Sequence, residues 1–315
     1  MRKISKFVSV CQHSFVFLQI ANESTTTNLA KNHQPVRKLF YLSVLCVLLT
    51  VSACHRQTKE KSEEVLAIPE CVVTSPPDSL QLDRFYTKYV DVNGLPLVSS
   101  WRVPDSAFVA AHRTLYAMTS MLDPKIIEAM KKAGARVAIM GRYEGTTDLP
   151  EHHYLVNDTA LNWDLRARGL GGTIEEPLTS CAEENVLAYQ IDKYHAEDIL
   201  VHEFAHAIHC IGIVQTDTTF NTRLQTLYEK AKKAGILDNT YRITDKEEYF
   251  AEAVQDWFDV NAEMPHTDGK HNWCNTREEL KLFDPGLYDL LAEFFPETSL
   301  HISKHPKTDL HHQPR

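Results

Sequence analysis

The chain lacks three features that would place it in common classes of protein. It has no excess of positive charge, because 33 lysines and arginines stand against 42 aspartates and glutamates. The formal net charge of −9, with no basic cluster, argues against nucleic acid as the main partner. The apolar run 39–51 is too short to span a bilayer comfortably. The glycines of residues 169–172 do not form a nucleotide-binding fingerprint, since no clear strand precedes them and no helix follows.

The apolar run 39–51 has the flanks of an export signal. Arg37 and Lys38 precede it, and two small residues and Cys54 follow it, as in a secretory signal peptide. Residues 51–54 also resemble the lipobox of bacterial lipoproteins, in which the cysteine is lipidated; the alternative is an ordinary signal peptide with an incidental cysteine. We expect an exported cell-envelope lipoprotein, at the outer membrane or the cell surface, which contacts the membrane only through its lipid.

The position of this signal also predicts how the chain is divided. A signal peptide begins at the N-terminus, so residues 1–35 look like an extension ahead of the true start, for which Val36 is a hypothesis. The length of the chain, 315 residues, suits one large domain or two small ones. We expect an N-terminal extension and signal peptide over 1–54, a polar tether over 55–68, a catalytic domain over 69–297 and a disordered tail over 298–315.

The segment 199–209, ILVHEFAHAIH, contains His-Glu-x-x-His inside an apolar, helix-compatible run. His202 and His206 lie one turn apart on the same side of a helix, so both imidazoles can bind one metal ion. Glu203 lies about 100° around the helix, close enough to hold a water on that metal. This pattern is typical of zinc hydrolases, with the glutamate as general base. The alternative is a chance match, but a buried helix with three histidines and a glutamate needs a reason, because unpaired buried charge is costly.

A zinc hydrolase needs a third protein ligand, and families differ in where they supply it. The pattern H-E-x-x-H-x-x-G-x-x-H is excluded, because its glycine position holds His209 and its last histidine position holds Gly212. The other common solution is a glutamate on a second helix, and residues 247–258 have helical spacing. Glu248 and Glu252 share a face, so one can bind the metal while the other hydrogen-bonds a ligand histidine. Spacing alone does not choose between them, and two solvated surface carboxylates remain the alternative.

The sequence His-Glu-Phe-Ala-His, followed by Tyr241 and then Glu-Tyr-Phe-Ala-Glu-Ala, resembles the zinc peptidase domain of anthrax lethal factor and its relatives. The resemblance covers roughly residues 196–258. It implies zinc as the cofactor, with Glu248 as the third ligand and Glu252 as the partner of a ligand histidine. It also implies that Tyr241, seven residues before the ligand glutamate, stabilises the reacting oxyanion.

This resemblance implies a zincin-like α+β fold: a small mixed sheet with the active-site helix, followed by a mainly helical C-terminal subdomain. Residues 105–122 and 124–132 read as helices, and residues 136–140 as a strand whose place in the sheet cannot be read. Residues 141–195 read as mostly irregular, with a turn at 169–172 that brings backbone near the site. Further helices are predicted in the segments 217–234, 278–282 and 285–295.

Four cysteines remain after the signal region: Cys71, Cys181, Cys210 and Cys274. An even number in an exported protein predicts disulfides, with three possible pairings; the alternative is four reduced thiols. A bridge between Cys210 and Cys181 would brace the metal helix. Cys181 as a metal ligand is a further alternative.

The expected function is zinc-dependent hydrolysis of peptide bonds by a monomeric endopeptidase that acts on a protein or peptide. One alternative is a surface binding lipoprotein that keeps the peptidase fold and cleaves nothing, which the intact Glu203 and Tyr241 argue against. The other is a zinc amidase or deformylase with a non-protein substrate, which export and the second glutamate helix argue against. The sequence does not specify the substrate.

Overall fold

The computed structural model describes residues 66–300. The predicted signal peptide, Cys54, nearly all of the tether and most of the tail lie outside these residues. Leu66, at the start of the described part, already packs against the hydrophobic core. Within residues 66–300, no helix combines the length and the apolar character that a membrane crossing requires.

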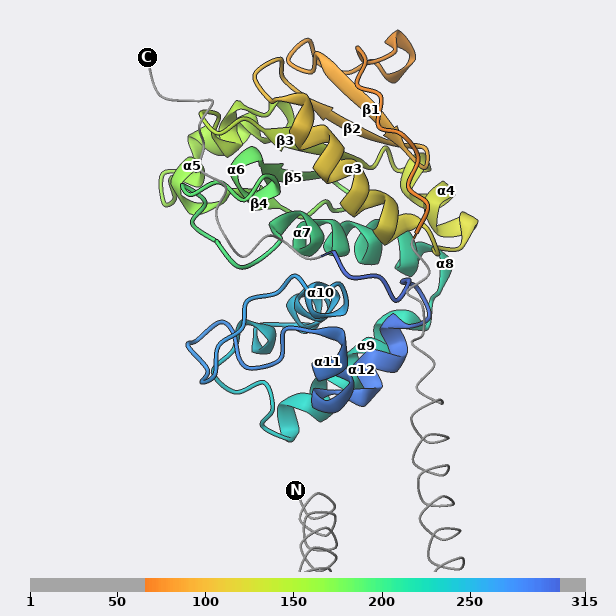
Figure 1. Ribbon diagram of the computed structural model, residues 1–315, viewed down its shortest axis with the longest axis vertical. Coiled ribbons are helices and arrows are strands. Elements are labelled where there is room, and N and C mark those ends of the chain that lie inside the picture. The colour runs from red at the N-terminus through yellow and green to blue at the C-terminus, as the bar shows by residue number, and fades with distance from the viewer. Residues whose placement is uncertain (1–65, 301–315) are drawn as a thin grey trace, which may run out of the picture. The chain divides into compact units, whose positions relative to one another are not determined.

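The sheet begins with a hairpin between strands β1 (Lys88–Val92) and β2 (Leu95–Ser99). The two strands pair antiparallel, with Val92 opposite Leu95. The connecting residues Asn93 and Gly94 have φ of 53° and 86°, which is the backbone that an Asn-Gly hairpin turn requires. This hairpin forms one edge of the sheet, on the far side from the metal helix (Figure 1).

Three further strands complete a five-stranded mixed sheet in the order β1-β2-β3-β5-β4. Strands β3 (Arg136–Met140) and β5 (Leu178–Ala182) run parallel to β2 and to each other. The short strand β4 (Gly169–Leu170) pairs antiparallel with β5 and forms the second edge. The predicted strand at 136–140 is therefore confirmed, and it lies in the centre of the sheet.

The prediction that residues 141–195 are mostly irregular was wrong. This segment contributes β4 and β5, the short helices α5 (Trp163–Arg166) and α6 (Glu183–Val186), and two 3-10 helices, Thr146–Asp148 and Pro150–Asn157. All five residues of β5 are buried, although Thr179 and Ser180 make the strand look polar in the sequence. Helix α7 packs on β5, and Leu178 and Ala182 join a second apolar cluster, so both faces of the strand are covered and no alternation of polar and apolar residues is needed.

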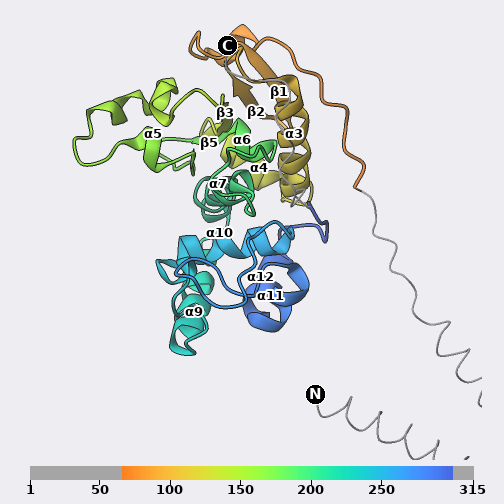
Figure 2. The same ribbon diagram turned by 60° about the vertical axis from the view of Figure 1, so that its left-hand side comes forward.

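Two helices connect β2 to β3 and were predicted closely. Helix α3 (Asp105–Thr119) ends three residues before the predicted boundary, and α4 (Pro124–Lys132) has the predicted bounds. The Asp123 side chain accepts a hydrogen bond from Lys125 N and caps α4. Helix α3 packs against the metal helix α7 (Ile199–Ala207), which lies below the sheet (Figures 1 and 2).

Helix α7 does not end at its motif but continues through a π-helical segment, Ile208–Ile213, into the short helix α8 (Val214–Thr216). Single π-helical turns are rare and often occur next to functional sites. The segment packs tightly on α4, because a Cβ on Gly212 would lie 2.7 Å from a methyl carbon of Ile126. Glycine is therefore needed here for close approach, and α7 is fixed against the sheet half of the domain.

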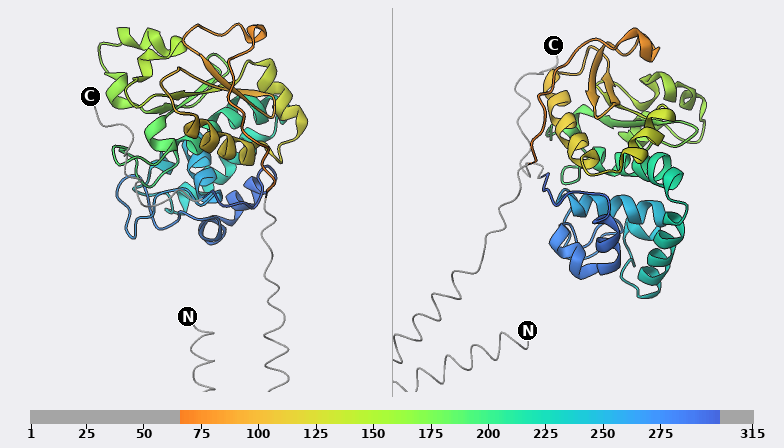
Figure 3. Two further views of the ribbon diagram at one scale, coloured as in Figure 1. Left: turned by 45° about the horizontal axis from the view of Figure 1, so that its top comes forward. Right: turned by 90° about the vertical axis from the view of Figure 1, so that its right-hand side faces the viewer.

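The C-terminal half is helical, as expected. It contains α9 (Phe220–Lys233), a 3-10 helix at Tyr241–Ile243, α10 (Lys246–Trp257), α11 (Arg277–Phe283) and α12 (Pro285–Leu291). Helix α10 packs against α7 on one side and against the other C-terminal helices on the other (Figure 3). The described part is thus a mixed α+β structure with one small sheet, in which α7 and α10 meet between two halves.

The predicted disulfides are not formed: all four cysteines in the described part are free thiols. Cys181 is buried in β5, and Cys274 is buried where its Sγ lies 3.3 Å from Asp256 Oδ2. Cys71 and Cys210 are half-buried. Cys210 therefore does not brace the metal helix through Cys181, and packing of α7 on both halves takes that role.

Candidate active site

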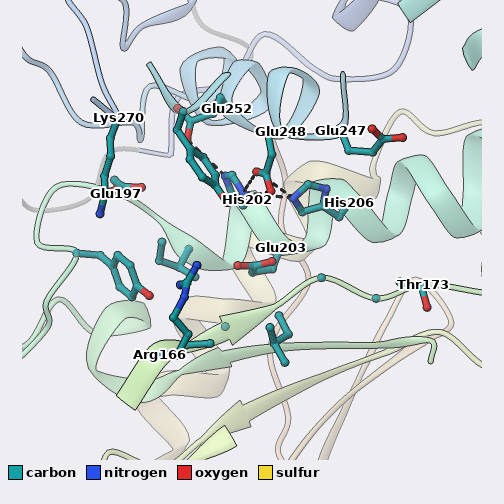
Figure 4. A pocket seen from close by; sticks show the side chains of 18 of the residues that line it. Arg166, Thr173, Glu197, His202, Glu203, His206, Glu247, Glu248, Glu252 and Lys270 are labelled. Atoms are coloured by element: carbon teal, nitrogen blue, oxygen red, sulfur yellow. Dashed lines mark hydrogen bonds and ion pairs between the residues drawn. The ribbon is translucent and has the colours of Figure 1, made fainter. Parts of the chain in front are cut away.

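Helices α7 and α10 bring three predicted ligands to one point. His202 Nε2 lies 3.3 Å from His206 Nε2 and 3.0 Å from Glu248 Oε2, and His206 Nε2 lies 3.6 Å from the same oxygen (Figure 4). The two histidines share a face of α7, and Glu248 occupies the first turn of α10. Asp245 caps that turn, because its side chain accepts a hydrogen bond from Glu248 N at 2.8 Å. This bond fixes the backbone from which the Glu248 side chain extends.

These three distances match the spacing that zinc requires of its ligands. Zinc binds histidine nitrogen and carboxylate oxygen at about 2.0–2.2 Å in tetrahedral geometry. Two ligand atoms of such a site therefore lie about 3.3–3.5 Å apart. The observed distances, 3.0, 3.3 and 3.6 Å, bracket this value. The residues fit a zinc ion without rearrangement of either helix.

The charges of the cluster also favour a cation at its centre. Burial works against a positive charge on His202, but the hydrogen bond to Glu248 and the nearby glutamates outweigh it and raise the pKa of His202 to about 10. In the same way, the histidines hold the pKa of Glu248 well below its usual range, although burial opposes this. The site stabilises positive charge between these groups, whether a proton or a metal ion supplies it.

Gln255 orients the first histidine, and sequence reasoning missed it. Its Nε2 donates to Asp198 O at 3.1 Å, so its Oε1 is the acceptor that faces His202 Nδ1 at 2.9 Å. Gln255 therefore holds a hydrogen on His202 Nδ1, which leaves Nε2 as the atom that can bind a metal ion, as in metal-binding histidines. Gln255 follows Glu248 by seven residues, two helical turns along the same face, and this spacing was the available signal.

Glu252 was expected to make that hydrogen bond, and the structure gives it different partners. Its Oε1 lies 3.8 Å from His202 Nδ1, beyond hydrogen-bonding distance. Its Oε2 accepts from Asn261 Nδ2 at 3.1 Å and lies 3.9 Å from Arg242 Nε. The position that reaches the histidine is one turn further along α10, and Glu252 contributes negative charge close to His202 without the hydrogen bond.

Tyr241 lies beside the ligand cluster. Its hydroxyl donates to Glu248 Oε1 at 3.1 Å, and its side chain is 37% exposed, so it borders the open side of the site. Its backbone N donates to Lys270 O at 2.8 Å. The next residue, Arg242, is buried and pairs with Asp256 at 2.6 Å, which anchors this 3-10 helix to α10.

Glu203 and the edge strand close the site from below. Glu203 lines the same cavity as the two histidines, and burial raises the pKa of its carboxyl. A Cβ on Gly169 would lie 3.1 Å from Glu203 Cγ, and one on Gly171 would lie 2.7 Å from His206 Cβ. The glycines thus allow backbone close to α7, as predicted, but this backbone is an edge strand and its extension and not a turn.

The cavity has a volume of about 550 Å³ and is lined from both halves of the domain. From the sheet half come the α5–β4 segment and α7, and from the helical half come Tyr241, α10 and the loop around Lys270 (Figure 4). Leu170 and the glycines at 169, 171 and 172 all lie along one wall. The free edge of the sheet therefore runs along the cavity that contains the three ligands.

Comparison with known proteins gives a similarity among solved structures and none among families or curated proteins. No family model matches the chain, and no curated protein matches it either. Among solved structures, the chain is similar to the PRO-PRO endopeptidase PPEP-2 from Paenibacillus alvei, at 21% identity over 63% of this chain and 96% of that chain, with a TM-score of 0.38. A TM-score of this size does not establish a shared fold, so the geometry of the site carries the argument.

The first prediction separates the roles of the groups on α10. Glu248→Ala removes a ligand and should yield protein that purifies largely free of zinc. Gln255→Leu removes only the orienting hydrogen bond and should weaken zinc binding by about 10–100-fold. Glu252→Ala should weaken it less, because Glu252 makes no hydrogen bond to His202. Mass spectrometry of metal content and competition with a calibrated chelator measure all three.

The matched control for this series is Glu247→Ala, which removes a carboxylate from the same helical turn that is outside the ligand cluster. It should bind zinc as the unaltered protein does. A zinc-free Glu252→Ala protein, with Glu248→Ala still loaded, would show that the ligand is one helical turn further along.

Proposed function

We propose that this chain is a zinc-dependent endopeptidase of the kind represented by the anthrax lethal factor-like zinc peptidases, with a zincin-like fold. The observation that supports this most strongly is the convergence of His202, His206 and Glu248 with ligand atoms within 4.8 Å of one another. Glu203 and Tyr241 face the same cavity. An idle binding protein would not need a general base and a hydroxyl beside its ligands.

The ligands, the general base and the hydroxyl would have separate roles. His202, His206 and Glu248 would hold zinc, which supplies Lewis acidity to water and to a carbonyl oxygen. Glu203 takes the proton of the attacking water and delivers it to the leaving amine, and its raised pKa suits both halves of that transfer. Tyr241 donates a hydrogen bond to the oxyanion as charge develops there.

The free edge of β4 supports a peptide as the substrate. An extended peptide can add to an exposed sheet edge through main-chain hydrogen bonds, with side chains in alternate pockets. The glycines at 169 and 171 let this edge of the sheet lie directly against Glu203 and His206, so a peptide paired with the edge would pass close to both. An extended chain on this edge would bring one of its carbonyl groups to the ligand cluster. We infer that the substrate is a protein or peptide bound in an extended conformation.

The second prediction concerns the two catalytic side chains. Glu203→Gln should retain zinc, because Glu203 is not a ligand, and should lose turnover by about 100-fold or more. Tyr241→Phe should lower kcat by about 100-fold with little change in zinc content. Digestion of an unbiased peptide library, with a chelator-treated sample as control, measures both.

Two outcomes would contradict the roles assigned to Glu203 and Tyr241. Loss of zinc from a well-folded Glu203→Gln protein would contradict the assignment of the base. A change in KM alone for Tyr241→Phe would assign Tyr241 to substrate binding and not to the transition state.

We further propose that the protein is exported and held at the cell envelope by a lipid on Cys54. The support is the sequence alone: Arg37-Lys38, the apolar run 39–51 and the small residues before Cys54. A lipid-anchored peptidase would act on proteins outside the cytoplasm.

The third prediction tests this location. Radiolabelled fatty acid should label the protein in the membrane fraction, and Cys54→Ser should remove the label and release the protein. Equal labelling of the Cys54→Ser variant would rule out this anchor.

A further inference from the structure

One end of the active-site cavity carries two exposed cationic side chains, in a chain that is acidic overall. Arg166 and Lys270 lie on the same side of the ligand cluster, opposite Thr173 (Figure 4). An adjoining cavity of about 480 Å³ shares both residues and adds Lys193. Arg166 ends α5, just before β4, whereas Lys270 comes from the helical half, so the two cations reach the cavity from opposite walls.

The carboxylates at this end already have partners. Glu197 Oε1 lies 3.0 Å from His271 Nε2. Asp268 accepts hydrogen bonds from the backbone N of Lys270 and of His271, at 2.9 and 2.7 Å. Glu252 accepts from Asn261. These carboxylates keep their negative charge, but none of them forms an ion pair with Arg166 or Lys270 in the described part of the chain.

Arg166 and Lys270, in contrast, are exposed and make no side-chain hydrogen bond or ion pair within residues 66–300. Burial, together with Arg168, Arg166 and Lys270, lowers the pKa of the neighbouring Lys193, whereas Glu184 opposes this shift. Two unpaired cations thus face the cavity near the proposed reacting centre.

The direction of β4 determines which part of a substrate would meet them. The chain runs from Arg166 through Gly169 and Leu170 toward Thr173. A peptide that pairs antiparallel with this edge has its amino-terminal part near Thr173 and its carboxyl-terminal part near Arg166. Residues that follow the cleaved bond would therefore lie beside Arg166 and Lys270.

We propose that this end of the cavity binds a carboxylate on the leaving-group side of the scissile bond. The inference rests on the proposed peptidase function and deepens it by naming a feature of the substrate. The carboxylate belongs either to an aspartate or glutamate side chain soon after the bond or to the free C-terminus of a short peptide. Arginine and lysine on opposite walls can both donate charge-assisted hydrogen bonds to it.

The test uses matched peptides built on a sequence cut by the zinc-loaded full-length protein. One has glutamate after the bond and an amidated C-terminus, the second has glutamine there and a free C-terminus, and the third has glutamine and an amide. We expect kcat/KM to be about tenfold higher for the first or the second than for the third, with the advantage falling as salt is raised. The faster of the two identifies the source of the carboxylate.

Variants of the two cations sharpen the test. Arg166→Gln with Lys270→Gln should bring the ratio of charged to uncharged peptide close to one. Arg166→Glu with Lys270→Glu should favour a peptide with lysine at that position. Lys233→Gln, which removes an exposed lysine from the end of α9 outside the cavity, should leave the ratio as it was. A ratio measured within one protein does not depend on how much of that protein is folded.

Three results would overturn the proposal. Equal cleavage of all three peptides, or a preference for acidic residues only before the cleaved bond, contradicts it while the peptidase function stands. Failure of the zinc-loaded protein to cleave any peptide of the library contradicts the proposed function and this inference with it.

Discussion

The packing of α10 against α7 is the interaction on which the site depends. Neither helix holds a complete ligand set, since the two histidines lie on α7 and the glutamate on α10. Gln255 ties the helices together, because one buried amide bonds both the backbone at the start of α7 and the ring of His202. A shift of one helix along the other would therefore have two effects at once. It would break the hydrogen bond that orients His202, and it would separate Glu248 from the two histidines.

Each helix is held in turn by its own half of the domain. Helix α7 packs on α3, and the π-helical segment that follows it packs on α4 through Gly212. Helix α10 is fixed by the buried pair Arg242 and Asp256, whose side chains are 2% and 0% exposed. Such a pair contributes little net stability compared with apolar residues, but removing one partner costs about 3–5 kcal/mol. Because Arg242 directly follows Tyr241, this pair also helps to hold the Tyr241 hydroxyl beside Glu248.

The sequence predicted what depends on periodicity and spacing along one chain segment. The four-residue interval in α7 and the bounds of α4 and β3 are of this kind, whereas Tyr241 and Glu248 were singled out by the family resemblance. It did not predict β5, whose polar residues are buried because elements distant in the sequence cover both faces of the strand. Nor did it predict Gln255, because the choice between Glu252 and Gln255 depends on where α10 crosses α7. The number of cysteines in the sequence did not predict that all four in the described part are free, because pairing depends on where the fold places them.

The central claim is that His202, His206 and Glu248 bind one zinc ion together. The most direct measurement is anomalous diffraction at the zinc edge from crystals of the zinc-loaded protein. The account predicts a single strong peak about 2.0–2.2 Å from His202 Nε2, His206 Nε2 and Glu248 Oε2. A second group of potential ligands, Glu197, Glu252 and His271, lies in the same cavity. A peak at that group alone, or no peak at either, would contradict the account.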